Sequence, residues 1–245
     1  MILLVDAGNT RIKWRVISPG EPLRAVDEGA LAHEAIGELA AICRRHAGLG
    51  RVFGCNVAGI GVANAIAAAC GPLAVDWLHP GASCCGVRNL YEQPAQLGAD
   101  RWAALIGARQ THAHACLVVT AGTATTVDLL SAAGDFLGGL ILPGVDLMQQ
   151  SLARGTAQLP LADGHFALQP RRTIDAIRSG CLQAQAGAVE RMFCQIADAP
   201  GATCLLGGGA AASFADLLGI PLRRIDNLVL LGLGAIAGAA ALTRH

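Results

Sequence analysis

The chain has 245 residues, of which 53% are hydrophobic and 15% are charged. This composition supplies enough apolar side chains for buried sheets and too little charge for a disordered chain, and the length suits two lobes of about 120 residues each. Lysine plus arginine equals aspartate plus glutamate, 18 each, so the zero net charge argues against a general nucleic-acid binder.

The nine cysteines are expected to be reduced. Their number is odd, none forms a C-x-x-C pair, and Met1 leads directly into a strand-like run without a signal peptide, which together indicate a cytosolic protein. The adjacent Cys84 and Cys85 could form a metal or redox site, but no His or Cys has ligand spacing to them, which favours simple packing. The apolar run Leu228–Leu242 is too short to span a bilayer and predicts a buried or dimer-facing helix.

The first half of the chain predicts strands separated by helices. Ile2–Val5 is a continuous apolar run, and Ile12–Ile17 alternates apolar with charged residues, the pattern of a half-buried strand. Apolar residues at helical spacing predict a helix over Leu31–Ala47. The elements expected next are a strand, a helix, a strand, a loop and a helix: Arg51–Cys55, Val62–Cys70, Leu73–Leu78, Pro80–Gln96 and Arg101–His112.

The same pattern then restarts. The strands expected in the second half are Cys116–Val119, Val127–Leu130, Phe136–Leu142 and Thr203–Leu206, and the helices begin at Pro143 and Thr173. The turns Asp6–Thr10 and Thr120–Ala124 each follow an apolar strand, about 114 positions apart, which indicates a duplicated lobe. Two glycine turns of this length can also resemble each other by chance.

The first turn has the chemistry of a phosphate site. Small residues over 6–10 let backbone N–H groups and hydroxyls approach a phosphate, Asp6 could hold a hydrated Mg²⁺, and Lys13 could reach the phosphates. The same pattern is also an ordinary hairpin turn. The second turn, Gly122–Thr126, carries three hydroxyls; it is either ordinary sheet surface or the second grip on a polyphosphate in a cleft. Gly207–Gly209 would let a base or ribose lie close to the backbone.

Five segments along the chain share one pattern of motifs. They are D-A-G-N-T-R-I-K at 6–13, Y-E-Q-P-A-Q-L-G-A-D-R at 91–101, G-T-A-T-T at 122–126, G-G-L-I-L-P-G at 138–144 and T-I-D-A-I-R-S-G at 173–180. Together they resemble the type III pantothenate kinase family, within the actin, hexokinase and Hsp70 ATPase superfamily. The resemblance implies an α/β fold of two ribonuclease-H-like lobes, 1–115 and 116–245, with ATP and substrate in the cleft between them. It also implies a homodimer that uses Mg-ATP to phosphorylate pantothenate to 4'-phosphopantothenate, the first step of coenzyme A biosynthesis.

The resemblance assigns roles to individual residues. ATP binding is expected from Asp6, Ala7, Gly8, Asn9, Thr10, Arg11, Ile12, Lys13, Gly122 and Thr123. Substrate binding is expected from Tyr91, Gly98, Ala99, Asp100, Arg101 and Thr173. Asp100 is the candidate base for the substrate hydroxyl, and Arg101 could bind the substrate carboxylate. Without the family pattern, these two residues would be interpreted as a helix-capping aspartate and a surface arginine.

The sequence departs from the family at Thr120. The family usually has aspartate there, and that carboxylate is associated with a monovalent cation such as potassium or ammonium. Threonine is a weaker, neutral ligand, so we expect potassium activation to be weak or to use main-chain carbonyls. Asp128 is nearby in sequence, but strand alternation does not assign it to the cleft.

Two alternatives remain open at this stage. A kinase of another small hydroxyl or carboxylate metabolite would keep both turns but would not need Tyr91 or the G-A-D-R segment. A catalytically weakened regulatory descendant would keep the fold, and the change at Thr120 supports it. The intact Asp6, Lys13 and Asp100 favour an active enzyme.

Overall fold

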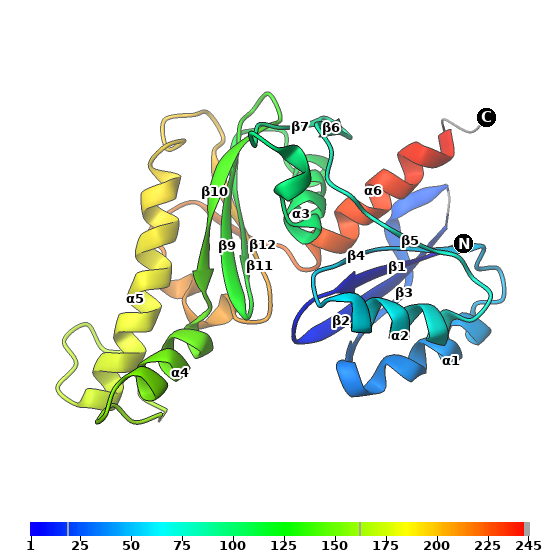
Figure 1. The fold of residues 1–245 in the computed structure, drawn as a ribbon. Helices are drawn as coiled ribbons and strands as arrows, with labels where there is room; N and C mark the ends of the chain where they lie inside the picture. Colours follow the sequence, from blue (N-terminus) through cyan, green and yellow to red (C-terminus); the bar gives the residue numbers. More distant parts are fainter. Residues whose placement is uncertain (19, 162, 243–245) are drawn as a thin grey trace. The chain divides into compact units, whose positions relative to one another are not determined.

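The structure is a computed structural model that describes residues 1–18, 20–161 and 163–242 (Figure 1). Its contacts group the chain into two compact units. Unit 1 consists of Met1–Ala113, Gly134–Phe136 and the chain from Asn227 onward, and unit 2 consists of His114–Ala133 and Leu137–Asp226. The division into domains 1–115 and 116–245 stays a prediction. The two compact units differ from it, because the contacts of the C-terminal helix place that helix with unit 1.

Unit 1 is built on a five-stranded sheet with the order β3-β2-β1-β4-β5. The strands are β1 (Ile2–Ala7), β2 (Arg11–Ser18), β3 (Glu21–Ala32), β4 (Arg51–Asn56) and β5 (Val75–Trp77). β1, β2 and β3 are antiparallel neighbours, whereas β4 and β5 continue the sheet in parallel with β1. The strands predicted near residues 2, 12 and 51 are confirmed.

Helices cover both faces of this sheet (Figure 1). On one face a 3-10 helix (His33–Glu38), α1 (Leu39–Arg45) and α2 (Ile60–Cys70) enclose a core with the apolar residues of β1 and β2. The helix predicted over Leu31–Ala47 is wrong at its first two residues, and the 3-10 helix precedes the α-helix within the rest of the segment. Leu31 and Ala32 instead end β3, because the long β2–β3 hairpin pairs them with Ile12 and Arg11.

Two helices that are far apart in the chain pack closely against each other in unit 1. They are α3 (Ala99–Thr111) and α6 (Leu228–Leu242). A Cβ on Gly107 of α3 would overlap the carbonyl of Leu228, and a Cβ on Gly232 of α6 would overlap the carbonyl of Ala103, so glycine is required at both positions. The apolar C-terminal helix is therefore buried against α3. Among the described residues, none of the helices combines the length and apolarity needed to cross a membrane.

The segment predicted as a loop over 80–96 contains short regular elements. β6 (Ser83–Cys84) and β7 (Val87–Asn89) form an antiparallel hairpin, and a 3-10 helix covers Pro94–Gln96. β7 also pairs in parallel with the start of β10 (Asp135–Pro143) through Arg88 with Asp135 and Asn89 with Phe136. These pairs hold the segment that leads to Tyr91.

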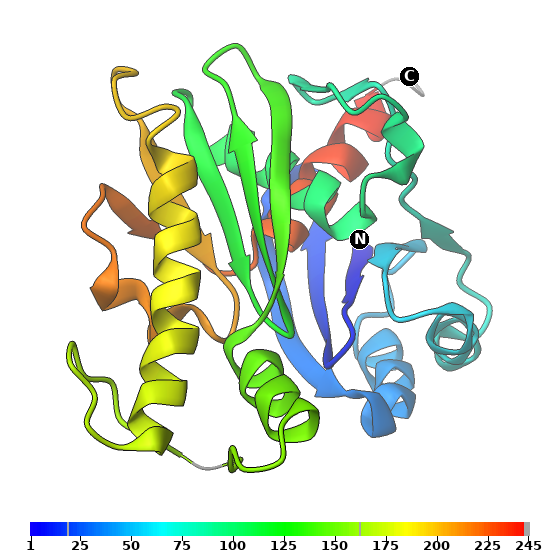
Figure 2. The same cartoon turned by 60° about the vertical axis from the view of Figure 1, so that its left-hand side comes forward.

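The second sheet has seven strands in the order β12-β11-β8-β9-β10-β7-β6, and its first five repeat the sheet of unit 1. The remaining strands are β8 (Cys116–Ala121), β9 (Ala124–Leu130), β11 (Thr203–Gly207) and β12 (Leu222–Arg224). The helices are α4 (Val145–Gly155) and α5 (Thr173–Phe193), with 3-10 turns at Ala211–Ser213 and Ala215–Leu217. Figure 2 shows the long α5 running beside the sheet, where it closes the core of unit 2.

The two units share topology and burial. In each, an antiparallel three-stranded meander is followed by two strands parallel to its first strand. β1 and β8 have the same residue-by-residue burial, and so do β2 and the corresponding seven positions of β9. This agreement confirms the predicted α/β fold with a duplicated lobe.

Candidate active site

Asp6 lies near the end of β1, between two strands that carry polar partners. Its neighbours in register are Lys13 of β2 and Cys55 of β4. Sγ of Cys55 donates a hydrogen bond to Oδ1 of Asp6 at 3.4 Å. Paired residues point to the same face of a sheet, so these three side chains gather on the face opposite the α1–α2 core.

The carboxylate of Asp6 is poorly compensated. Burial raises the pKa of Asp6 to about 6, and repulsion from Asp100 adds to the increase, while the Cys55 thiol and Lys13 oppose it. Burial also raises the pKa of the Cys55 thiol well above its usual value, with Asp6 and Asp100 adding to the shift. The structure thus brings Asp6 and Asp100, which are 94 positions apart in the chain, within electrostatic reach of each other.

Asp100 stands in the first turn of α3, after the N-cap residue Gly98. Its Oδ1 accepts a hydrogen bond from the backbone N–H of Arg101 at 2.8 Å. A Cβ on Gly98 would lie 2.6 Å from that same oxygen, so the glycine leaves room for the carboxylate. Asp100 is partly exposed, so a molecule in solution can reach its carboxylate.

Arg101 is buried, with only 5% of its surface exposed, so the interpretation as a surface arginine is wrong. Its Nη1 donates to the hydroxyl of Tyr91 at 2.9 Å. Its guanidinium carbon lies 5.7 Å from the ring centroids of both Tyr91 and Phe136, and these two rings are 5.1 Å apart. Asn89 fixes the approach to this cluster, since its Oδ1 accepts from the N–H of Tyr91 at 3.1 Å. The guanidinium of Arg101 is therefore fixed in position beside the rings of Tyr91 and Phe136.

The first predicted turn is closed by its own backbone. The N–H of Gly8 donates to the carbonyl of Arg11 at 3.2 Å, and Nε2 of His33 donates to the carbonyl of Gly8 at 2.9 Å. The side chains of Asn9 and Thr10 are exposed at its tip, whereas Ala7 and Ile12 are buried in the core and present only their backbones. Asn9 and Thr10 are therefore the accessible side chains at the tip of this turn.

The second predicted turn is one residue tighter. In unit 2 the N–H of Gly122 donates to the carbonyl of Ala124 at 3.0 Å, and the N–H of Gly144 donates to the carbonyl of Thr123 at 2.8 Å. A Cβ on Gly144 would overlap the carbonyl of Gly122, and one on Gly208 would overlap the carbonyl of Ala121. Two side-chain-free positions thus support the turn from behind, while Thr123 is exposed.

The pairing register of β8 with β9 shows which residues of unit 2 correspond to Asp6 and Lys13 of unit 1. Thr120 pairs with Thr126 as Asp6 pairs with Lys13, so the carboxylate and ammonium are replaced by two hydroxyls. Asp128 is 1% exposed and, two residues after Thr126, points to the same face as Thr120. Strand alternation alone did not show which face of the sheet carries Asp128. The pairing register places it on the same face as Thr120.

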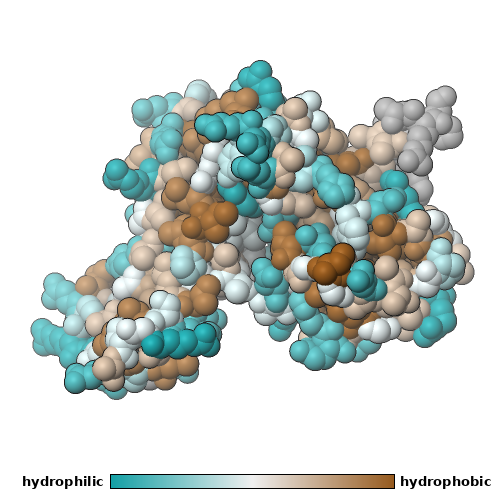
Figure 3. All heavy atoms as spheres, in the orientation of Figure 1, coloured by the Kyte–Doolittle hydropathy of each residue, from teal (hydrophilic) through white to brown (hydrophobic). Residues whose placement is uncertain are grey.

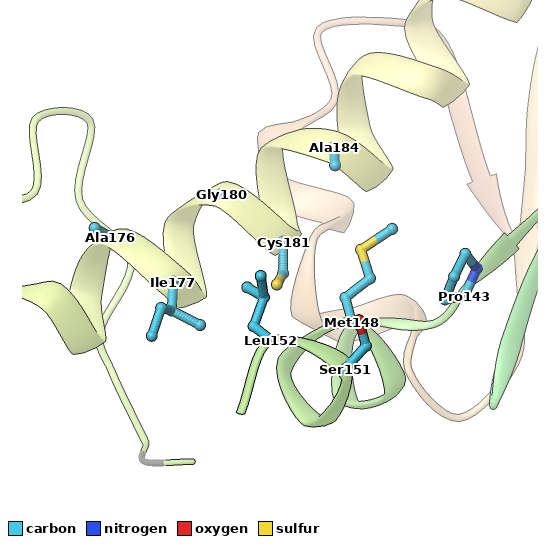
Figure 4. Close-up of a pocket in the computed structure, with 9 residues that line it drawn as sticks. All are labelled: Pro143, Met148, Ser151, Leu152, Ala176, Ile177, Gly180, Cys181 and Ala184. Carbon is cyan, nitrogen blue, oxygen red and sulfur yellow. The ribbon is translucent and has the colours of Figure 1, made fainter. Parts of the chain in front are cut away.

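Thr173 is the exposed first residue of α5 in unit 2. Further along this helix, Ile177 and Cys181 face Met148 and Leu152 of α4 across a pocket of about 330 Å³ (Figure 4). Ser151 is the only polar side chain among the residues that line it. This pocket is apolar and contains none of the predicted site residues.

The residues around Asp6 fit a magnesium ion held by few protein ligands. Mg²⁺ keeps most of its water and commonly binds through one or two carboxylates. A divalent cation would stabilise the ionised form of Asp6, whose pKa is raised first by burial and then by the nearby charge of Asp100. Within the described ranges, no three His, Cys, Asp or Glu side chains gather as a closed metal centre. A hydrated ion carried in with a nucleotide suits this donor set.

Three contributors to the site were not predicted from the sequence. Cys55 touches Asp6, Phe136 forms a wall beside Tyr91 and Arg101, and Asn89 holds the backbone of Tyr91. Each acts through a contact between distant segments or inside a segment expected to be a loop. Cys55 ends one predicted strand and Phe136 begins another, but neither position indicates the contact that the residue makes.

Comparison with known proteins gives a family match over most of the chain. A sequence model described as type III pantothenate kinase matches residues 2–195. A protein named type III pantothenate kinase from Aromatoleum aromaticum is 62% identical over 239 residues, which are 97% of this chain and 98% of that protein.

Solved structures with low identity share the fold. A putative Baf family transcriptional activator from Campylobacter jejuni aligns over 99% of this chain and 100% of its own, with a TM-score of 0.61 and 19% identity. A putative 2-dehydro-3-deoxygalactonokinase from Sinorhizobium meliloti covers 99% of both chains, with a TM-score of 0.60 and 17% identity. At these identities the likeness extends to the architecture alone.

Proposed function

This chain belongs to the type III pantothenate kinase family, and on that premise we propose that it transfers the γ-phosphoryl group of ATP to the hydroxyl of pantothenate, yielding 4'-phosphopantothenate. This reaction opens coenzyme A biosynthesis. The observation that carries the proposal is the arrangement in unit 1, where the Asp6 and Asp100 carboxylates interact beside a buried Arg101 held by Tyr91.

Asp100 is the proposed base for the pantothenate hydroxyl. Phosphoryl transfer depends on an aligned hydroxyl, neutralised phosphate oxygens and a group that accepts the hydroxyl proton. A partly exposed carboxylate at the start of α3 can accept that proton. Arg101 pairs with the substrate carboxylate, because its guanidinium is buried and can form two parallel charged hydrogen bonds. Tyr91 contributes a wall of the same pocket, and Gly98, Ala99 and Thr173 are the further substrate contacts.

Nucleotide contacts are assigned to the small-residue turn of each unit. Asp6 would hold the hydrated Mg²⁺ that accompanies ATP and neutralises charge on its phosphates. Lys13 adds a positive charge beside Asp6, and the turn over 8–12 presents its backbone and its exposed side chains to the phosphates. Gly122 and Thr123 contribute the corresponding contact from unit 2.

Measuring ADP release with and without pantothenate tests the proposed reaction. We expect release to require pantothenate and to match, mole for mole, the phosphopantothenate detected by mass spectrometry. Pantothenol, in which an alcohol replaces the carboxylate, is expected to react more slowly because Arg101 loses its charged partner. Release that ignores pantothenate, or that responds better to another hydroxy acid, would favour a kinase of a different metabolite.

Potassium or ammonium is expected to activate this enzyme weakly. Thr120 and Thr126 offer neutral hydroxyls where the other unit has a carboxylate and an ammonium, so a monovalent cation would depend on main-chain carbonyls or on Asp128 from the same face. A titration of turnover against KCl at constant ionic strength should be nearly flat. The Thr120→Asp variant should show a steeper response, and a steep response of the wild type would contradict the proposal.

A homodimer in the cytoplasm is the proposed form of the enzyme. Leu137, Leu140 and Ile141 of β10 and Leu147 of α4 are exposed, and Figure 3 shows apolar atoms gathered over β10, as expected for a surface that a second copy covers. Sedimentation at twice the 25.0 kDa chain mass would support this state. None of the nine cysteines, all of which lie in the described part of the chain, forms a disulfide, which suits a reducing compartment.

A further inference from the structure

Cys84 and Cys85 present two thiols side by side at the surface of unit 1. Their Sγ atoms are 3.5 Å apart, and both residues are partly exposed. Five of the other cysteines are buried, and the exposed Cys194 stands apart in unit 2. A pair of accessible, adjacent sulfurs is therefore a chemical feature that the proposed phosphoryl transfer does not use.

The backbone holds this pair in a fixed turn. Ser83 pairs with Arg88 and Cys84 with Val87, which leaves Cys85 and Gly86 as the two turn residues. Their φ angles are +48° and +80°. Such turns strongly favour Asn, Asp or Gly at the first of these positions, so a cysteine there is unusual. The carbonyl of Cys85 also accepts a hydrogen bond from Nε2 of Gln110 at 3.3 Å, which ties the turn to α3.

We propose that Cys84 and Cys85 form a two-thiol binding site for thiophilic groups of the trivalent arsenical class. Sulfur bonds to metal-like centres are about 2.3 Å long, so one centre can reach two sulfurs that are 3.5 Å apart. With an organic arsenoxide, each thiol forms one S–As bond, the As=O bond breaks, and the two thiol protons leave with that oxygen as water. The reaction is a condensation without oxidation or reduction.

A second thiol pair provides the comparison. Cys43 of α1 and Cys70 of α2 are within hydrogen-bonding distance of each other. Cys70 is only 2% exposed, because it belongs to the core between these helices and the sheet. A reagent would have to open that core to bond both sulfurs. The hairpin pair is thus the accessible one.

Binding of an arsenical at Cys84 and Cys85 should change the proposed substrate pocket around Tyr91. β7 follows the turn directly and ends at Asn89, whose side chain accepts from the N–H of Tyr91, and Tyr91 in turn accepts from Arg101. A bulky organic group bonded to both sulfurs would crowd the residues next to this turn, and we expect it to disturb the position of Tyr91 through β7. This step rests on the proposed function, because it expects a higher KM for pantothenate with little change in KM for ATP.

Phenylarsine oxide and intact-protein mass spectrometry test the site without reference to activity. We expect one adduct per chain, formed with loss of one water, which survives excess 2-mercaptoethanol and is removed by 2,3-dimercaptopropanol. Cys85→Asn should abolish this adduct while keeping the turn, since asparagine adopts positive φ readily, and Cys84→Ser should abolish it as a second variant. Cys43→Ser and Cys194→Ser should leave it intact.

The outcomes separate the site from its effect. Absence of a monothiol-resistant adduct on the wild type, or its persistence in both Cys84→Ser and Cys85→Asn, would overturn the site. An adduct that leaves the KM for pantothenate unchanged would overturn the coupling to Tyr91 while the site stands. Failure of the kinase assay itself would contradict the proposed function and leave the mass measurement valid.

Discussion

Replacing Asp100 with asparagine is expected to lower kcat by about 10²–10⁴-fold, the usual range for loss of a general base. Asparagine can still accept the hydrogen bond from the N–H of Arg101, so the start of α3 should keep its structure. It cannot accept the proton of the substrate hydroxyl. Steady-state kinetics with pantothenate and Mg-ATP should therefore show a large fall in kcat with nearly unchanged KM values.

Asp146→Asn is the matched control for that experiment. Asp146 is also the second residue of a helix that follows a glycine N-cap, but it is exposed on α4 in unit 2. Loss of a negative charge near a helix N-terminus costs about 0.3–1 kcal/mol of stability in either variant. If Asp100→Asn lowers turnover no more than Asp146→Asn does, Asp100 acts on its helix and is not the base.

Replacing Asp6 with asparagine should produce opposite effects on activity and stability. The variant loses the carboxylate proposed to hold the hydrated Mg²⁺, so we expect kcat/KM for Mg-ATP to fall by about 10²–10³-fold. Without nucleotide or Mg²⁺, however, the same change removes a charge that the folded protein compensates poorly. The variant should therefore unfold at a higher temperature than the wild type at neutral pH.

The pH dependence of this stabilisation has a defined sign. Burial raises the pKa of Asp6 from 3.8 to about 6, so the folded state retains the proton more tightly than the unfolded state does. The contribution of Asp6 to stability is fully present below pH 4 and is lost as the pH rises through 6. The gain from Asp6→Asn should approach about 3 kcal/mol at pH 8 and shrink as the pH falls towards 4.

Urea unfolding at pH 5 and pH 8 measures this difference, with Asp76→Asn as the control. Asp76 lies on β5 of the same sheet with an exposed side chain, so its replacement should change stability little at either pH. An Asp6→Asn variant that is less stable than the wild type at pH 8 would contradict the charge balance described for Asp6.

Much of the element order could be predicted because local patterns and the repeat agree. The apolar run at Ile2–Val5 and the alternation at Ile12–Ile17 determine strands on their own, and the restart at Cys116 repeats them. Helical spacing over Leu31–Ala47 misled at its start because the β2–β3 hairpin extends to Ala32 through pairing with Arg11. Tertiary pairing overrode a local pattern there.

The sequence pointed to the carboxylates of the candidate site but not to the contacts that hold the residues around them. Motif positions identified Asp6, Asp100, Arg101 and Tyr91, whereas the contact of Cys55 with Asp6 depends on the parallel register of β1 and β4. The burial of Arg101 depends on Phe136, which arrives from β10 through the pairing of that strand with β7. Neither register can be deduced from one sequence.

The crossing of α3 and α6 at Gly107 and Gly232 has a consequence for synthesis on the ribosome. The helix α6, which covers one face of the first sheet, is translated after all of unit 2. Unit 2 can therefore fold while the N-terminal sheet still exposes the apolar surface that α6 will bury. Unit 1 is therefore begun before unit 2 but completed after it. A premature stop before Leu228 would leave the apolar face of the N-terminal sheet without α6.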